Sequence, residues 1–229
     1  MKELVHTMRM VNPEDTEIYQ MSEWWRKGTS VPIDNPNFLQ ILQFYLIECP
    51  VSIPSGKDSN GRNKRSHVSE QGRTFEEIGW IGKNLTALWN VMKKASIIQY
   101  KCVNTPVKSA DIAGEVENII HSSNQKDEHF ELICFVENSE IGKIRSIFYA
   151  IRNALAHGSF SVNNNNGKPV YYFQSERNGE IRSQIRLKES TLLRWIELFN
   201  MPVSEVRALN QSQKGKKTSK KRNEVHIYE

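Results

Sequence analysis

Cationic, phenolic, amide and imidazole side chains recur along one side of the segment 140–157, and these residue types suit phosphate binding and proton transfer. Projected at about 100° per residue, they lie away from the apolar stripe of the same segment. The group consists of Arg145, Tyr149, Arg152, Asn153 and His157. No carboxylate follows Glu140 on this face, whereas an ordinary solvated face usually carries lysine and glutamate. The sequence therefore predicts an anion-binding surface on one helix.

The end of this segment carries the residues that could do chemistry. His157 is followed by Gly158, which ends a helix in the usual way. An imidazole that titrates near neutrality serves as a general acid or base. Arg152 lies about one turn earlier and offers a planar, two-pronged donor, while Asn153 is an i, i+4 neighbour of His157 that could orient the ring. A lone histidine at a helix end is more often only a cap, but this combination favours a site.

The six residues Arg152–His157, with the sequence RNALAH, resemble the R-x4-H motif of the HEPN superfamily. HEPN proteins are helical bundles that usually pair as dimers. Many are metal-independent endoribonucleases of prokaryotic defence, antiviral or toxin systems. The resemblance covers about residues 140–200. It implies that Arg152 stabilises the scissile phosphate, that His157 transfers protons and that Asn153 orients the site. Arg145 and Tyr149, which share the polar face in the helix projection, are expected to contribute to substrate binding.

The resemblance also implies a reaction and a set of partners. The RNA 2′-OH would attack the adjacent phosphate and leave a 2′,3′-cyclic phosphate, with no metal and no cofactor. Each chain offers one motif histidine, so a homodimer through the motif-helix face would complete the site. RNA and a regulatory protein such as an antitoxin are the expected partners. Ser159 stands where some members carry a tyrosine that accepts AMP, so that form of regulation is not expected. The alternative is a non-catalytic HEPN module that binds RNA, a nucleotide or a protein partner.

The remaining pattern predicts mainly helices. Asn178-Gly179 lies between two short apolar runs and predicts a β-hairpin at about 169–188. The predicted fold is all-α, a HEPN-like helical bundle with one β-hairpin inserted before the last helix, in a single domain over residues 1–210. Helices are expected at about 12–27, 35–49, 75–100, 110–121, 127–136, 140–157 and 190–200.

Most of the net charge of +5 comes from the C-terminal end. Residues 214–229 hold six basic and two acidic residues, so 211–229 is expected to be a flexible basic tail. It would bind RNA by counterion release or serve only as a solubilising end. The basic residues are Lys214, Lys216, Lys217, Lys220, Lys221 and Arg222. A second basic stretch at 50–74 is expected to be a long loop, either functional or mobile.

Several classes of protein are excluded by the same sequence. No run of 18 apolar residues occurs and the N-terminus lacks the apolar core of a signal peptide, so a cytoplasmic protein is expected. The three cysteines form no C-x-x-C pair, and the spacing of His121, His129 and Cys134 does not match a zinc site, so no metal is expected. The five tryptophans are expected in the core rather than stacked on bases.

Overall fold

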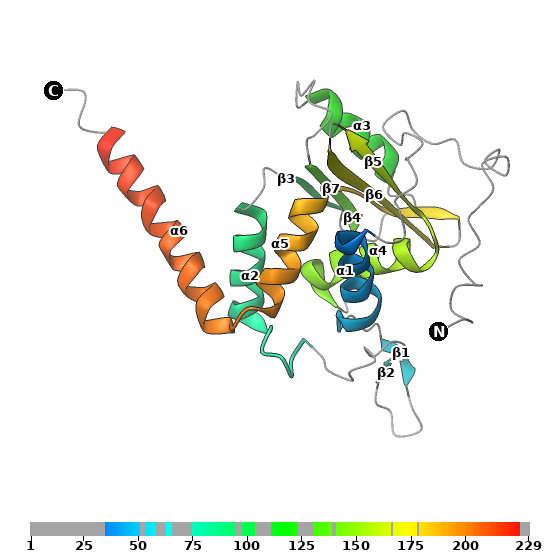
Figure 1. Ribbon diagram of the computed structural model, residues 1–229, viewed down its shortest axis with the longest axis horizontal. Helices are drawn as coiled ribbons and strands as arrows, with labels where there is room; N and C mark the ends of the chain where they lie inside the picture. Colours follow the sequence, from blue (N-terminus) through cyan, green and yellow to red (C-terminus); the bar gives the residue numbers. More distant parts are fainter. Residues whose placement is uncertain are drawn as a thin grey trace.

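The computed structural model contains a five-stranded mixed β-sheet with helices on both faces (Figure 1). The residues that it describes are 35–50, 54–57, 63–65, 75–94, 98–103, 111–122, 131–138, 141–165, 167–177 and 179–224. The helical elements are α1 (Pro36–Leu42), the π-helical turn η3 (Gln43–Glu48), α2 (Gly82–Lys94), α3 (Ile112–Ser122), α4 (Gly142–Ala156), α5 (Glu189–Asn200) and α6 (Val203–Glu224). The strands are β1 (Pro54–Lys57), β2 (Asn63–Arg65), β3 (Ile98–Val103), β4 (Glu131–Val136), β5 (Phe160–Asn165), β6 (Lys168–Arg177) and β7 (Glu180–Lys188).

The order of strands in the large sheet is β3-β4-β7-β6-β5. Only β3 and β4 run parallel, and α3 connects them, as a crossover between parallel strands requires. The other neighbours are antiparallel, including the long β6–β7 pair. β4 therefore lies inside the sheet, between a parallel and an antiparallel partner.

Each face of the sheet has its own apolar core, because successive side chains of a strand point to opposite faces. Ile133 and Phe135 of β4 join the large core under α1, α2, α4 and α5. Leu132 and Cys134 join a smaller core with α3 on the other face. All six residues of β4 are buried, which explains why the strand shows no polar alternation.

The expectation of an all-α bundle is wrong, since the structure places a five-stranded sheet at the centre of the molecule. Residues 131–136 were expected within a helix, but a short apolar run fits a helix and a strand buried on both faces equally well. The helix expected over 75–100 is shorter, because α2 covers only residues 82–94. The end of that segment is β3, whose isoleucine, tyrosine and valine favour a strand.

The β-hairpin expected at 169–188 is confirmed, as β6 and β7 pair antiparallel on either side of Gly179, which has a φ of +77°. The structure adds β5 as a third strand of this antiparallel unit, and this strand extends into the asparagine-rich stretch before β6. Phe160 and Val162 face the large core. Only these two residues of β5 alternate with polar ones before the run of asparagines, which is too short a pattern to predict a strand from the sequence.

Three further expectations meet the structure only in part. The helix expected at 12–27 lies outside the described residues, and so does most of the loop at 50–74, where 54–57 and 63–65 form the antiparallel pair β1–β2. The backbone of 203–224 is the helix α6, which begins beside α2 and runs away from the rest of the molecule (Figure 1). Flexibility of the tail stays a prediction. No helix in the described ranges is long and apolar enough to cross a bilayer.

The two-sided burial of β4 predicts the cost of shortening its side chains. Ile133→Ala and Leu132→Ala should each lower the free energy of unfolding by about 2–5 kcal/mol, because each leaves a cavity in a different core. Chemical denaturation monitored by circular dichroism measures this. Leu39→Ala is the control, since Leu39 is 46% exposed and its loss should cost less than about 1 kcal/mol. A negligible effect of Leu132→Ala would contradict the strand assignment.

Candidate functional site

The inner face of α4 fixes the rotation of the helix that carries the motif. Phe148, which is 1% exposed, lies in a cluster of aromatic rings drawn from three other segments. Its ring centroid is 5.9 Å from that of Tyr45 and 5.8 Å from that of Phe199. Ile151 and Leu155 continue this buried stripe toward the end of the helix. Because these side chains are held in the core, the other side of α4 must face outward.

The motif residues lie on this outward side. Arg152 and Asn153 are half-buried and His157 is exposed. At about 100° per residue, the three span an arc of roughly 140°, with Asn153 between the other two. Within the described part of the chain, no hydrogen bond or ion pair engages their side-chain polar groups. The guanidinium, the amide and the imidazole are thus each available to a ligand.

The backbone at the end of α4 sets the position of His157. Its amide donates to Asn153 O over 2.9 Å, and Gly158 then adopts a φ of +69°. The amide of Ser159 donates to Ala154 O over 2.8 Å, and that of Gly158 to Leu155 O over 3.3 Å. These two bonds form a Schellman motif. Ser159 O accepts in turn from the amide of Gln174, which ties the helix end to β6.

Two residues expected at the site are engaged elsewhere. Arg145 forms an ion pair with Glu76, from the turn before α2, and its guanidinium lies 5.1 Å from the centre of the Phe75 ring. Tyr149 is half-buried and packs against the large core. The outward face therefore narrows from five polar residues to Arg152, Asn153 and His157. The sequence could not show the pairing of Arg145, because Glu76 is far away along the chain.

The basic residues of the C-terminal segment belong to α6. Its second half leads away from α4, so these residues are not grouped with the motif within one chain (Figure 1). They are Lys214, Lys216, Lys217, Lys220, Lys221 and Arg222.

The tryptophans and the histidine and cysteine residues discussed in the sequence analysis do not form a second site among the described residues. Trp80, Trp89 and Trp195 are buried, so the interior holds them rather than a base-stacking surface. Cys134 is fully buried against α3, and burial raises its pKa to about 12. His129 lies outside the described residues. The ranges that are described hold no group of three or more residues able to bind a metal ion.

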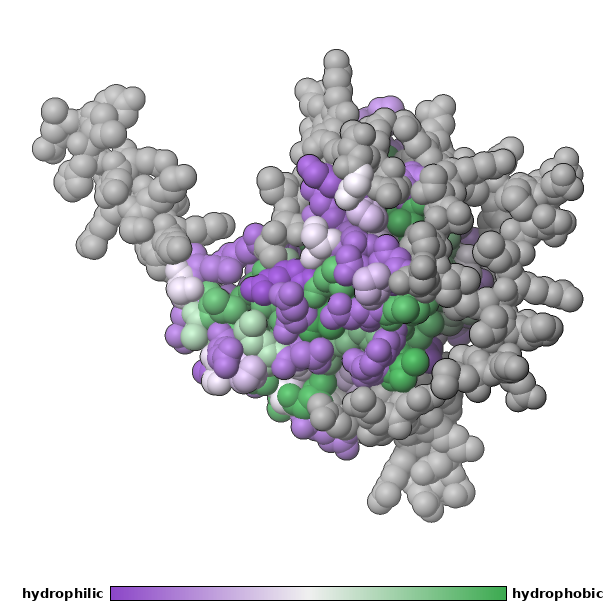
Figure 2. Space-filling model, viewed as in Figure 1, coloured by the Kyte–Doolittle hydropathy of each residue, from purple (hydrophilic) through white to green (hydrophobic). Residues whose placement is uncertain are grey.

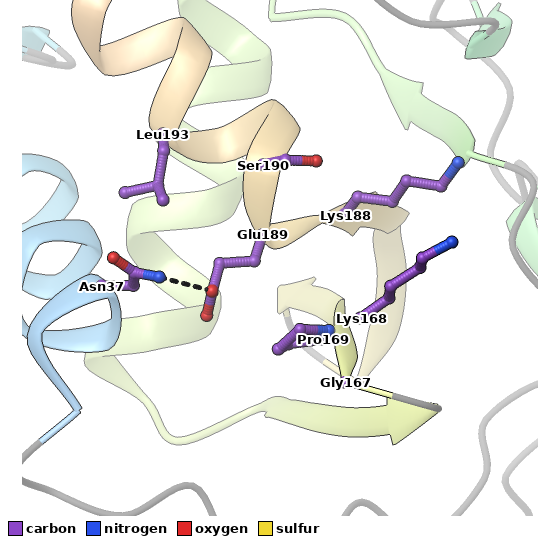
Figure 3. Close-up of a pocket in the computed structure, with 8 residues that line it drawn as sticks. All are labelled: Asn37, Gly167, Lys168, Pro169, Lys188, Glu189, Ser190 and Leu193. Atoms are coloured by element: carbon purple, nitrogen blue, oxygen red, sulfur yellow. Dashed lines mark hydrogen bonds between the residues drawn. The ribbon is translucent and has the colours of Figure 1, made fainter.

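Sequence reasoning missed a cavity of about 410 Å³ at the start of α5 (Figure 3). Glu189, which is 8% exposed, accepts hydrogen bonds there from Tyr171 Oη over 3.0 Å and from Asn37 Nδ2 over 2.8 Å. Burial and the Glu189 carboxylate raise the pKa of Tyr171, so the phenol stays protonated and keeps donating. The sequence gives no indication of this cavity, because Lys168 and Lys188 come together only through the register in which β6 pairs with β7.

On the face shown in Figure 2, hydrophilic and hydrophobic residues are interspersed. Comparisons of the chain with models of protein families, with curated proteins and with solved structures found no match. The resemblance to HEPN proteins therefore stays a prediction that rests on the sequence motif Arg152–His157.

The left-handed backbone after His157 predicts a stability effect at Gly158. Gly158→Ala should lower the free energy of unfolding by about 1–2 kcal/mol, because a Cβ is strained at this φ although no neighbour blocks it. Thermal and urea unfolding measure the loss. Gly158→Asn is the matched comparison, since asparagine tolerates this conformation better. Equal stability of the alanine variant and the parent would contradict this geometry.

Proposed function

We propose that this protein is an endoribonuclease that cleaves RNA without a metal ion, by attack of the RNA 2′-OH on the adjacent phosphate. The observation that carries the proposal is the outward group at the end of α4, where Arg152, Asn153 and His157 lie together without partners among the described residues. An exposed imidazole and a guanidinium on the same outward side of α4 match the two needs of the reaction, proton transfer and stabilisation of a charged phosphate.

The roles follow from the chemistry of each group. Arg152 donates hydrogen bonds to the nonbridging oxygens of the scissile phosphate, where its delocalised charge stabilises the pentavalent transition state. His157 accepts the proton of the 2′-OH or protonates the 5′-oxygen that leaves. Asn153 lies between them and orients the ring or the phosphate through its amide.

The reaction needs both a base and an acid, whereas one α4 presents a single histidine. A two-fold homodimer that faces two α4 ends across one cleft would supply the second. The exposed position of His157 leaves it accessible to such a partner. The setting in a prokaryotic defence or toxin system, with a regulatory protein that restrains the activity, is part of the same proposal and is supported by the motif resemblance.

The proposal predicts cleavage of RNA in excess EDTA, with products that end in a 2′,3′-cyclic phosphate. His157→Ala and Arg152→Ala should each lower the rate by about 10²–10⁴-fold, since each removes a group that acts in the transition state. Labelled oligoribonucleotides resolved on denaturing gels measure both rate and product. Activity lost with EDTA and restored by a divalent ion would contradict the mechanism.

Matched controls come from the same fold. His121 is an exposed histidine in the last turn of α3, and Arg207 is an exposed arginine on α6. His121→Ala and Arg207→Ala should retain the parental rate. Retained helicity of the His157 and Arg152 variants, measured by circular dichroism, separates a chemical loss from unfolding.

The second candidate function is RNA binding without cleavage, favoured by the six basic residues between Lys214 and Arg222 in the second half of α6. Residues 214–224 include no apolar side chain larger than glycine, so this half of the helix has no apolar face to bury and its charge suits a polyanion. Binding of this kind releases counterions and weakens with added salt.

Truncation after Gln213 tests the contribution of α6, because it keeps the part of the helix that begins beside α2. The slope of the logarithm of RNA affinity against the logarithm of salt concentration should become shallower, by up to about four for six contacts to single-stranded RNA. Fluorescence anisotropy at several salt concentrations measures it. An unchanged slope would exclude an electrostatic role of the segment, whatever the result of the cleavage assay.

A further inference from the structure

The cavity of about 410 Å³ lies where β6 begins and β7 passes into α5. Its lining includes Asn37, Lys168, Lys188, Glu189, Ser190 and Leu193, so it contains cationic, anionic and apolar groups within one small volume. In Figure 3 the two lysines extend toward one side, while Glu189, Asn37 and Leu193 gather on the other. A ligand that fits this cavity must therefore have two chemically different ends.

The lysine end is suited to an anion. Lys188 pairs with Val170 in the register of the two strands, and Lys168 lies two residues from Val170 on the same face. The backbone positions of such diagonal neighbours are about 7–8 Å apart, so both side chains can reach one shared partner. In the portions of the chain that the structure describes, neither lysine forms an ion pair. Two adjacent ammonium groups repel each other, and a phosphate bound between them would remove that repulsion.

The opposite end is suited to hydroxyl groups. Glu189 accepts one hydrogen bond from Tyr171 and one from Asn37, whereas a carboxylate offers about four acceptor positions. It therefore keeps acceptor capacity for hydroxyl donors of a ligand. Leu193 and Pro169 supply apolar surface for carbon–hydrogen faces. The described lining contains no aromatic side chain to stack on a base, so a sugar fits this end better than a nucleobase.

We propose that this cavity binds a phosphorylated sugar, with the phosphate between Lys168 and Lys188 and the sugar hydroxyls at Glu189. The ligand is either a free sugar phosphate or the phosphorylated 5′-terminal ribose of an RNA, because the two present the same groups. The site is separate from His157, since the six residues of β5, about 20 Å long, intervene. The proposal does not depend on ribonuclease activity.

Isothermal titration of the full chain with ribose 5-phosphate tests the site. The double variant Lys168→Gln/Lys188→Gln should bind at least about tenfold more weakly, because it loses two charge-assisted hydrogen bonds to the phosphate. Inorganic phosphate should bind more weakly than ribose 5-phosphate to the parent. Three results would overturn the proposal: a Kd for ribose 5-phosphate above about 10 mM, equal affinity of the double variant, or equal affinity for inorganic phosphate.

The control variant is Lys83→Gln/Lys94→Gln, which removes two exposed lysines of α2 and the same total charge. It should bind ribose 5-phosphate as the parent does, and an equal loss would show general charge attraction and overturn the site. A matched pair of oligoribonucleotides, with a 5′-phosphate and with a 5′-hydroxyl, distinguishes the two sources of the ligand. A preference for the 5′-phosphate that disappears in Lys168→Gln/Lys188→Gln assigns the site to an RNA end, and equal binding of the pair assigns it to a free sugar phosphate.

Discussion

The packing of Phe148 among the surrounding aromatic rings is the interaction on which the arrangement of the molecule depends. The ring contacts side chains from η3, from the turn before α2 and from α5, so one residue joins three segments to the motif helix. Because a helix buries one side only, this attachment settles which residues of α4 meet solvent. Arg152, Asn153 and His157 owe their accessibility to a hydrophobic contact that they do not make themselves.

Sequence patterns were sufficient where the signal is local. The bounds of α4 and α5 and the β6–β7 turn follow from apolar steps of three and four, from Gly158 and from Asn178-Gly179. They were insufficient for β4, because the neighbours that bury both of its faces lie far along the chain. A strand covered on both sides loses the alternation by which strands are identified, and the all-α expectation failed at that point.

In the candidate site, too, the sequence reveals what is local and does not reveal contacts between distant parts of the chain. The motif was visible in the sequence, since its members share two turns of one helix. The engagement of Arg145 by Glu76 was not visible, because it depends on how the turn before α2 meets α4. The lysine pair of the cavity was equally hidden, as Lys168 and Lys188 become neighbours only through the register of β6 against β7. Residues that are brought together by strand pairing leave no spacing rule in a single sequence.

The position of β4 also has a consequence for the order of folding. Leu132 pairs with Arg186, so the centre of the sheet closes only after the chain between them has folded back. Contacts of such long range carry a large loop-closure cost and form slowly. During synthesis α4 emerges after β3 and β4 but before β6 and β7, so its inner face then lacks the antiparallel strands against which it packs. The surface that carries the motif is therefore completed late in folding, after β6 and β7 have been synthesised.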